Sequence, residues 1–78
     1  MLKPVAESNI AVKFGRTGRR LRTEKGMSQE GFADHCGLHR TYMGSIERGE
    51  KVVSIETAQK VALGLGVSMA GLFAEVNA

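Results

Sequence analysis

Residues 29–48 read QEGFADHCGLHRTYMGSIER, and this stretch decides the fold. It holds two short segments with apolar residues at helical spacing, separated by Cys36-Gly37-Leu38. Gly37 supplies the positive φ that a sharp turn between two helices needs. Ala33 is small where the two helices would cross, so their backbones can approach closely. The stretch therefore predicts two short helices joined by a tight turn.

The apolar residues of this unit predict which side of it faces inward. The side chains expected in the core are Phe32, Cys36, Leu38, Met43 and Ile46. The opposite face of the second helix then carries short or cationic residues: Arg40, Thr41, Gly44, Ser45 and Arg48. Such a surface suits the reading of base edges in the major groove of DNA, and a glycine lets a base or sugar come close.

Glycines and serines divide the rest of the chain in the same way. Glycines suited to the left-handed helix cap stand where apolar runs stop: Gly26, Gly37, Gly49 and Gly66. Serines suited to N-capping stand where the next runs begin: Ser28, Ser54 and Ser68. We expect five helices, at about residues 9–25, 28–36, 39–48, 54–65 and 68–76. No run alternates with period two, so the prediction is an all-α fold without strands.

Domain organisation follows from length. The 78 residues suffice for one small domain, predicted at residues 9–78, with residues 1–8 as a flexible N-terminal arm.

The first helix has a gap in its apolar stripe, because Gly18 stands between Phe14 and Leu21. Gly15 and Gly18 each lower the helix propensity by about 1 kcal/mol relative to Ala.

Composition restricts the function classes. The single cysteine, Cys36, excludes an internal disulfide and suits a reducing compartment. No stretch approaches the roughly 20 apolar residues of a membrane span, and no signal peptide is visible, so we expect a cytoplasmic protein without membrane partners. Residues 1–26 carry a net charge of +5 and residues 27–78 one of −2. The basic first third suits a polyanionic partner, although a solvated helix face explains it equally well.

Metal binding and catalysis have little support. His35, Cys36 and His39 form a cluster, but structural zinc takes four ligands and no second cysteine pair exists. Ser45, His39 and Glu47 have the composition of a triad without a nucleophile elbow or an oxyanion hole. We therefore expect no metal, no cofactor and no enzymatic activity.

The motifs in register resemble those of one family. They are Leu21-Arg22, Met27-Ser28-Gln29-Glu30, Phe32-Ala33, Gly37-Leu38, Ile46-Glu47-Arg48-Gly49 and Gly66-Val67-Ser68. This pattern, over about residues 12–75, resembles the Cro/repressor-like (XRE) helix-turn-helix regulators, which have the lambda repressor-like fold. His39-Arg40-Thr41-Tyr42 and the following Gly44-Ser45 are most similar to the controller proteins of restriction–modification systems. Gly18 departs from the pattern, since the family usually has an aliphatic residue there.

The resemblance implies roles for individual residues. Base readers would be Arg40, Thr41, Ser45 and Gly44, with Arg40 on guanine and Thr41 on a thymine methyl group. Contacts to the DNA backbone would come from Gln29, Tyr42, His39, Arg48 and Lys51. Arg22 and Glu47 resemble an internal ion pair between the first and third helices.

The last apolar stripe predicts a homodimer. A core of short helices accepts only part of it, so the interface residues are expected to be Leu65, Met69, Leu72, Phe73 and Val76. A two-fold dimer would present two recognition helices to a pseudo-palindromic operator. The resemblance implies a regulator that activates and represses its own gene and an endonuclease gene, with RNA polymerase as a further partner. A phage-type repressor and an antitoxin with a helix-turn-helix domain remain as alternatives.

Overall fold

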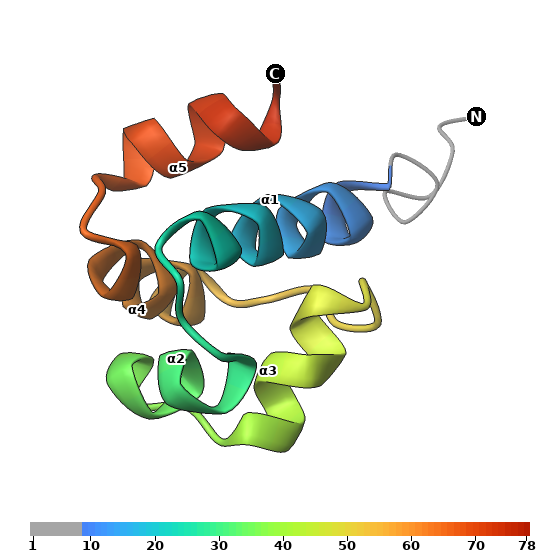
Figure 1. Cartoon of the computed structure of the whole chain (residues 1–78). Helices are drawn as coiled ribbons and strands as arrows, with labels where there is room; N and C mark the ends of the chain where they lie inside the picture. The colour runs from blue at the N-terminus through green and yellow to red at the C-terminus, as the bar shows by residue number, and fades with distance from the viewer. Residues whose placement is uncertain (1–8) are drawn as a thin grey trace.

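A computed structural model describes residues 9–78, and the arm predicted at residues 1–8 lies outside this range. The described chain forms five helices and no strand (Figure 1). The helices are α1 (Ile10–Glu24), α2 (Gln29–Cys36), α3 (Arg40–Glu47), α4 (Ile55–Leu65) and α5 (Met69–Val76). The predicted all-α fold with five helices is therefore confirmed.

Serine N-caps and glycine C-caps mark the ends of several helices. Ser28, Ser54 and Ser68 each accept a hydrogen bond from the backbone N–H three residues on, at 2.9–3.0 Å. These serines lie just outside their helices, so α2, α4 and α5 each start one residue later than predicted. Gly37 and Gly66 cap α2 and α4 with φ of 72° and 73°.

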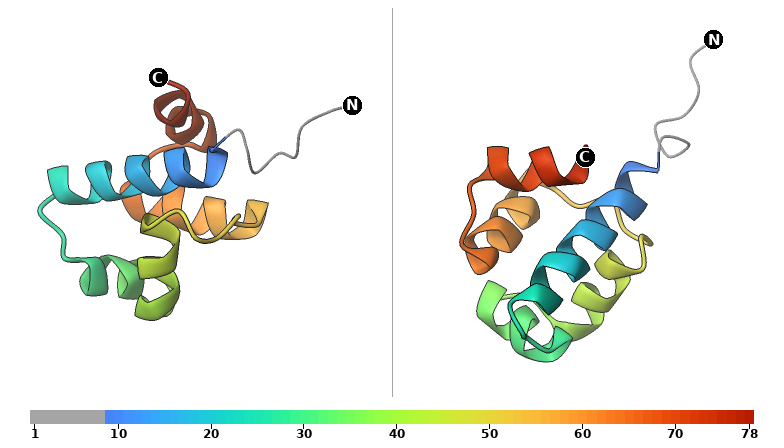
Figure 2. Two further views of the ribbon diagram at one scale, coloured as in Figure 1. Left: turned by 90° about the vertical axis from the view of Figure 1, so that its right-hand side faces the viewer. Right: turned by 45° about the horizontal axis from the view of Figure 1, so that its top comes forward.

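The arrangement leaves α2 and α3 together on one side of α1. α5 packs on the opposite side of α1, and α4 contacts α1, α2 and α5 (Figure 1). Figure 2 shows the same order from two further directions, with α5 at one end of the molecule and the α2–α3 pair at the other. The fold thus presents α3 at the edge farthest from α5.

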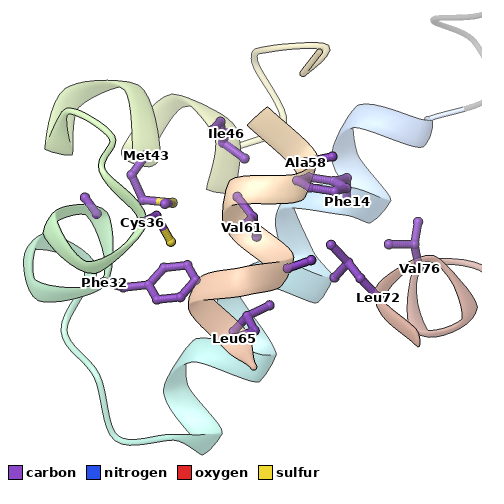
Figure 3. Packing of buried hydrophobic residues seen from close by; sticks show 12 residues of the cluster. Phe14, Phe32, Cys36, Met43, Ile46, Ala58, Val61, Leu65, Leu72 and Val76 are labelled. Atoms are coloured by element: carbon purple, nitrogen blue, oxygen red, sulfur yellow. The ribbon is translucent and has the colours of Figure 1, made fainter. Parts of the chain in front are cut away.

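The core lies where these helices meet. Figure 3 shows α4 between side chains of α2 and α3 on one side and of α5 on the other. The largest fully buried side chains are Phe32, Met43, Val61, Leu65 and Leu72. Phe32, Cys36, Met43 and Ile46, predicted to point inward, are all buried, and Leu38 is partly buried against them.

α5 is buried within one chain more deeply than its sequence predicts. Leu72 and Val76 are 0% and 3% exposed, and Leu65 at the end of α4 is 1% exposed. These three side chains offer no surface to a second copy, which corrects their assignment to a dimer interface. The reason is the 97° bend between α4 and α5, which turns the apolar face of α5 onto α1. Of the predicted interface residues, Met69 and Phe73 are only partly buried.

No single helix between residues 9 and 78 is long and apolar enough to cross a membrane. α4 and α5 meet the length and composition requirement only as a pair, with the 97° bend between them. Their apolar side chains, among them Val61 and Leu72, lie in the core.

Two glycines of α1 have opposite environments. A Cβ atom built on Gly15 would lie 2.2 Å from the carbonyl oxygen of Ile46 and 3.0 Å from that of Glu47. These are backbone atoms, so Gly15 is what allows α1 and the end of α3 to approach each other. Gly18 is buried too, but nothing lies within 4 Å of a Cβ there. The gap predicted at Gly18 is therefore real space.

Alanine at these two positions should change stability in opposite directions. Gly18→Ala fills open space and removes a helix-breaking residue, so it should stabilise the fold by about 0.5–1 kcal/mol. Gly15→Ala forces the helices apart and should destabilise it by about 1–3 kcal/mol or more. Thermal or urea unfolding of the two variants checks this. A destabilised Gly18→Ala or a neutral Gly15→Ala would contradict the packing described.

Candidate DNA-binding surface

The α2–turn–α3 unit is closed by backbone hydrogen bonds across Gly37. The Leu38 N–H donates to the carbonyl oxygen of Ala33 at 2.9 Å, and Gly37 N–H donates to that of Asp34 at 3.1 Å. Ala33 is 0% exposed at the crossing of the two helices, as predicted from its size. The unit is thus fixed from inside, and one face of α3 is left toward solvent.

This solvent face carries the side chains predicted to read bases. Arg40 and Thr41 are exposed in the first turn of α3, and Ser45 is half-buried one turn later. A hollow in the surface is lined by Gln29, Glu30, Arg40, Thr41, Gly44 and Arg48. We refer to these six residues and Ser45 as the reading surface. It joins the N-terminus of α2 to the exposed side of α3.

Gly44 forms the floor of the hollow. It is buried, because the side chains of Arg48 and Gln29 lie over it. A Cβ atom at this position would stand 3.1 Å from Arg48 Nη1 and 3.4 Å from Gln29 Oε1. The sequence predicts an outward glycine beside a base; in the structure the glycine instead lets two side chains lie close to α3.

A buried ion pair ties the reading surface to α1. Arg22 Nε and Nη2 donate to the two carboxylate oxygens of Glu47 at 2.7 and 2.9 Å. The side chains are only 9% and 4% exposed. Hydrogen bonding to Glu47 raises the pKa of Arg22 above its ordinary value. The pair that the family resemblance implies is therefore present, and it joins α1 to the end of α3.

The same ion pair also holds α2. Gln29 Nε2 donates to Glu47 Oε1 at 3.0 Å, and Arg22 Nη1 donates to the carbonyl oxygen of Met27 at 2.7 Å. Both residues stand at the entrance of α2. One carboxylate thus fixes the start of α2 and the end of α3 relative to α1. Gln29, predicted to hold a phosphate, has one amide hydrogen in this network and a second one left to donate.

Removing the carboxylate should destabilise the whole domain. Glu47→Ala leaves the buried Arg22 without its charge partner, so the free energy of unfolding should fall by about 3–5 kcal/mol. The matched control is Glu24→Ala, which removes an exposed carboxylate bonded to Arg20 at 3.0 Å. That control should cost at most about 1 kcal/mol. Urea unfolding of both variants measures the difference, and equal losses would disprove the structural role of Glu47.

His39 has a role that sequence analysis missed. Its Nδ1 accepts a hydrogen bond from the backbone N–H of Thr41 at 3.1 Å, so the imidazole caps the N-terminus of α3. The sequence places the helix start at His39 itself and its side chain on the DNA backbone. A histidine is uncommon among N-caps, which is why composition gave no signal.

The remaining predicted contacts have different surroundings. Tyr42 is half-buried and packs against the core, whereas Lys51 is exposed in the loop after α3. Arg48 is exposed and bonds to Glu50 at 2.8 Å. Contact with Glu50 raises the pKa of Arg48 and lowers that of Glu50. Glu30 pairs with the predicted base reader Arg40, and Glu50 pairs with the predicted backbone contact Arg48; neither pairing was predicted from the sequence.

The side chains of His35, Cys36 and His39 do not point toward a common site. Cys36 faces the core, and its burial raises the pKa of the thiol to about 11, whereas both histidines are exposed. Over residues 9–78 no three histidine, cysteine or carboxylate side chains are grouped so as to hold a metal ion.

Comparison with known proteins agrees with this geometry. A helix-turn-helix family model, HTH_3, matches residues 19–72. Control protein C.MunI from Mycoplasma sp is 40% identical over 71 residues, covering 90% of this chain and 96% of that protein. Control protein C.BamHI from Bacillus amyloliquefaciens is 46% identical over 61 residues, which are 77% of this chain and 75% of that protein. The crystal structure of the restriction–modification controller protein C.AhdI from Aeromonas hydrophila superposes with a TM-score of 0.77 at 46% identity, covering 81% of this chain and 96% of that one.

The chain belongs to the helix-turn-helix family of restriction–modification controller proteins. This controller protein is accordingly a DNA-binding transcriptional regulator and not an enzyme. The predicted family and function are confirmed, and the base and backbone contacts of individual residues stay predictions.

Proposed function

We propose that the controller protein binds a pseudo-palindromic operator as a homodimer, with α3 of each copy in the major groove. The observation that carries the proposal is the exposed Arg40–Ser45 side of α3, held rigidly from behind by the buried Arg22–Glu47 pair. A groove-reading helix needs both features, because flexible side chains on a mobile helix would lose entropy on binding.

The chemistry of the reading surface assigns the contacts. Arg40 donates to guanine O6 and N7, and the methyl group of Thr41 contacts that of thymine. Ser45 is a secondary reader one turn on. The backbone contacts are made by Gln29, His39, Tyr42, Arg48 and Lys51. Gln29 stands in the first turn of α2, where free N–H groups and the helix dipole favour a phosphate.

The dimer forms through an apolar surface on the side of α4 and α5. Val52 and Ile55, which flank the start of α4, are 75% and 81% exposed. They line a hollow with almost wholly apolar walls together with Met69 and Phe73. We call these four residues the apolar surface. It replaces the interface predicted from α5 and the end of α4, and it keeps the two partly buried residues of that prediction, Met69 and Phe73. A dimer that reads two half-sites one DNA turn apart requires its two α3 helices to lie roughly 34 Å apart.

The likeness to controller proteins supports a regulatory role within the cytoplasm. The operator lies upstream of the controller's own gene and of a restriction endonuclease gene. Occupancy of one site recruits RNA polymerase, and occupancy of further sites excludes it. The nuclease therefore appears only after the controller has accumulated. Sequencing of DNA fragments that the purified protein selects from a random pool identifies the operator and tests this proposal.

Arg40→Ala should weaken binding to the selected duplex by about 1–3 kcal/mol and relax the preference at one base position. The matched control is Arg20→Ala, which removes the same charge from a side chain bonded to Glu75 of α5, on the far side of α1 from α3. Fluorescence anisotropy with the selected duplex and its single-base variants measures both. Equal effects of the two variants would refute the assignment of α3 as the reading helix.

Ile55→Asp should yield monomers with much weaker operator binding, because a charged carboxylate would replace an apolar side chain of the interface and would lose its hydration there. Leu63→Asp is the control, since Leu63 is 70% exposed but lies beside Lys25 and His35 instead. Sedimentation velocity should find the control dimeric. An intact Ile55→Asp dimer would remove the apolar surface from the interface.

A further inference from the structure

Arg40 is held by a single oxygen of α2. Its Nη1 donates to Glu30 Oε2 at 2.7 Å, and both side chains are about two-thirds exposed, at 65% and 64%. Within residues 9–78 this is the one hydrogen bond recorded for the guanidinium. The Nε–Nη2 edge of Arg40 is therefore free to donate. Two parallel N–H groups on one edge are what bidentate contact with guanine O6 and N7 requires.

The second arginine of the reading surface is held differently. Arg48 uses its Nε–Nη2 edge for Glu50, with distances of 2.8 and 3.2 Å, and Nη2 also lies 3.5 Å from Ser45 Oγ. Its edge is occupied by a carboxylate from the same loop. The two arginines thus differ in which donors remain, although both are exposed and both are paired.

We propose that Glu30 increases the sequence specificity of the reading surface by holding Arg40 with its Nε–Nη2 edge turned to the bases. This role rests on the proposed function. Glu30 is a positioning residue: it bonds Nη1 and leaves the donors that read guanine. Arg40 keeps this ion pair while it reads a base, but must break it to swing out to a phosphate.

Base contacts and phosphate contacts by Arg40 should therefore differ in whether the ion pair with Glu30 is kept. On a matching site, the energy of the ion pair is retained in the complex, and the arginine is already ordered. On other DNA, a phosphate contact by Arg40 costs the ion pair. Because an exposed pair contributes modestly, the ratio of specific to non-specific affinity should rise by about two- to fivefold through Glu30.

The experiment compares Glu30→Ala with Glu75→Ala. Glu75 is a half-exposed carboxylate bonded to an arginine, Arg20, away from α3, so both variants lose one negative charge and one exposed ion pair with an arginine. Affinities are measured for the duplex that the wild-type protein selects, for the same duplex with its Arg40-read guanine replaced, and for a scrambled duplex. Circular dichroism confirms that both variants fold.

Glu30→Ala should lower the ratio of selected to scrambled affinity by about two- to fivefold, mainly through lost preference at the guanine. Glu75→Ala should leave this ratio unchanged. In an Arg40→Ala background, Glu30→Ala should have no further effect on preference, because its role runs through Arg40.

Three results would overturn the role of Glu30: a ratio that changes no more than in Glu75→Ala, a rise in the preference for the guanine, or a change of preference that persists without Arg40. The last would indicate that Glu30 reads a base itself. A wild-type protein that binds selected and scrambled duplexes equally would instead refute the proposed function.

Discussion

The bidentate ion pair between Arg22 and Glu47 is the constraint on which the reading surface depends. Two charges have been taken out of water, and they are stable there because each guanidinium nitrogen of Arg22 and both carboxylate oxygens of Glu47 have a hydrogen-bond partner. Gln29 and the Met27 carbonyl complete the set. Within residues 9–78 no buried side-chain nitrogen or oxygen lacks a hydrogen bond. The carboxylate of Glu47 belongs to α3, so the orientation of that helix is set by hydrogen bonds with specific directions as well as by apolar packing.

Glycine complements this network at two places where backbone or side chains lie close. Gly15 admits the end of α3 to the surface of α1, next to the ion pair. Gly44 admits Arg48 and Gln29 to the exposed side of the same helix. The first glycine lets the ion pair reach its short distances, since a side chain there would push Glu47 away from Arg22. Because the second has no Cβ atom, the side chains of Arg48 and Gln29 can pack directly against the backbone of α3.

Local features of this fold were predictable, and contacts between distant residues were not. Serine N-caps, glycine C-caps and apolar periodicity act within a few residues, so helix number and bounds followed from the sequence. Gly15 was judged only by its helix propensity, because the carbonyl of Ile46 that requires it lies far along the chain. Leu65, Leu72 and Val76 were assigned to a dimer interface for a similar reason: periodicity identifies an apolar face but not which element covers it. Arg22 and Glu47 were paired through the family resemblance, since their spacing carries no such signal.

The charge distribution also bears on how affinity and specificity are divided. Residues 1–26 carry a net charge of +5, whereas the reading surface pairs its arginines with Glu30 and Glu50. A near-neutral surface attracts phosphates weakly, so it contributes discrimination more than general affinity. General affinity must then come from contacts at its margins, and in the proposed dimer also from the second half-site, which is bound at a high effective concentration. On this proposal, the direction of a few donors sets the operator preference, and the pairing of two copies sets the binding strength.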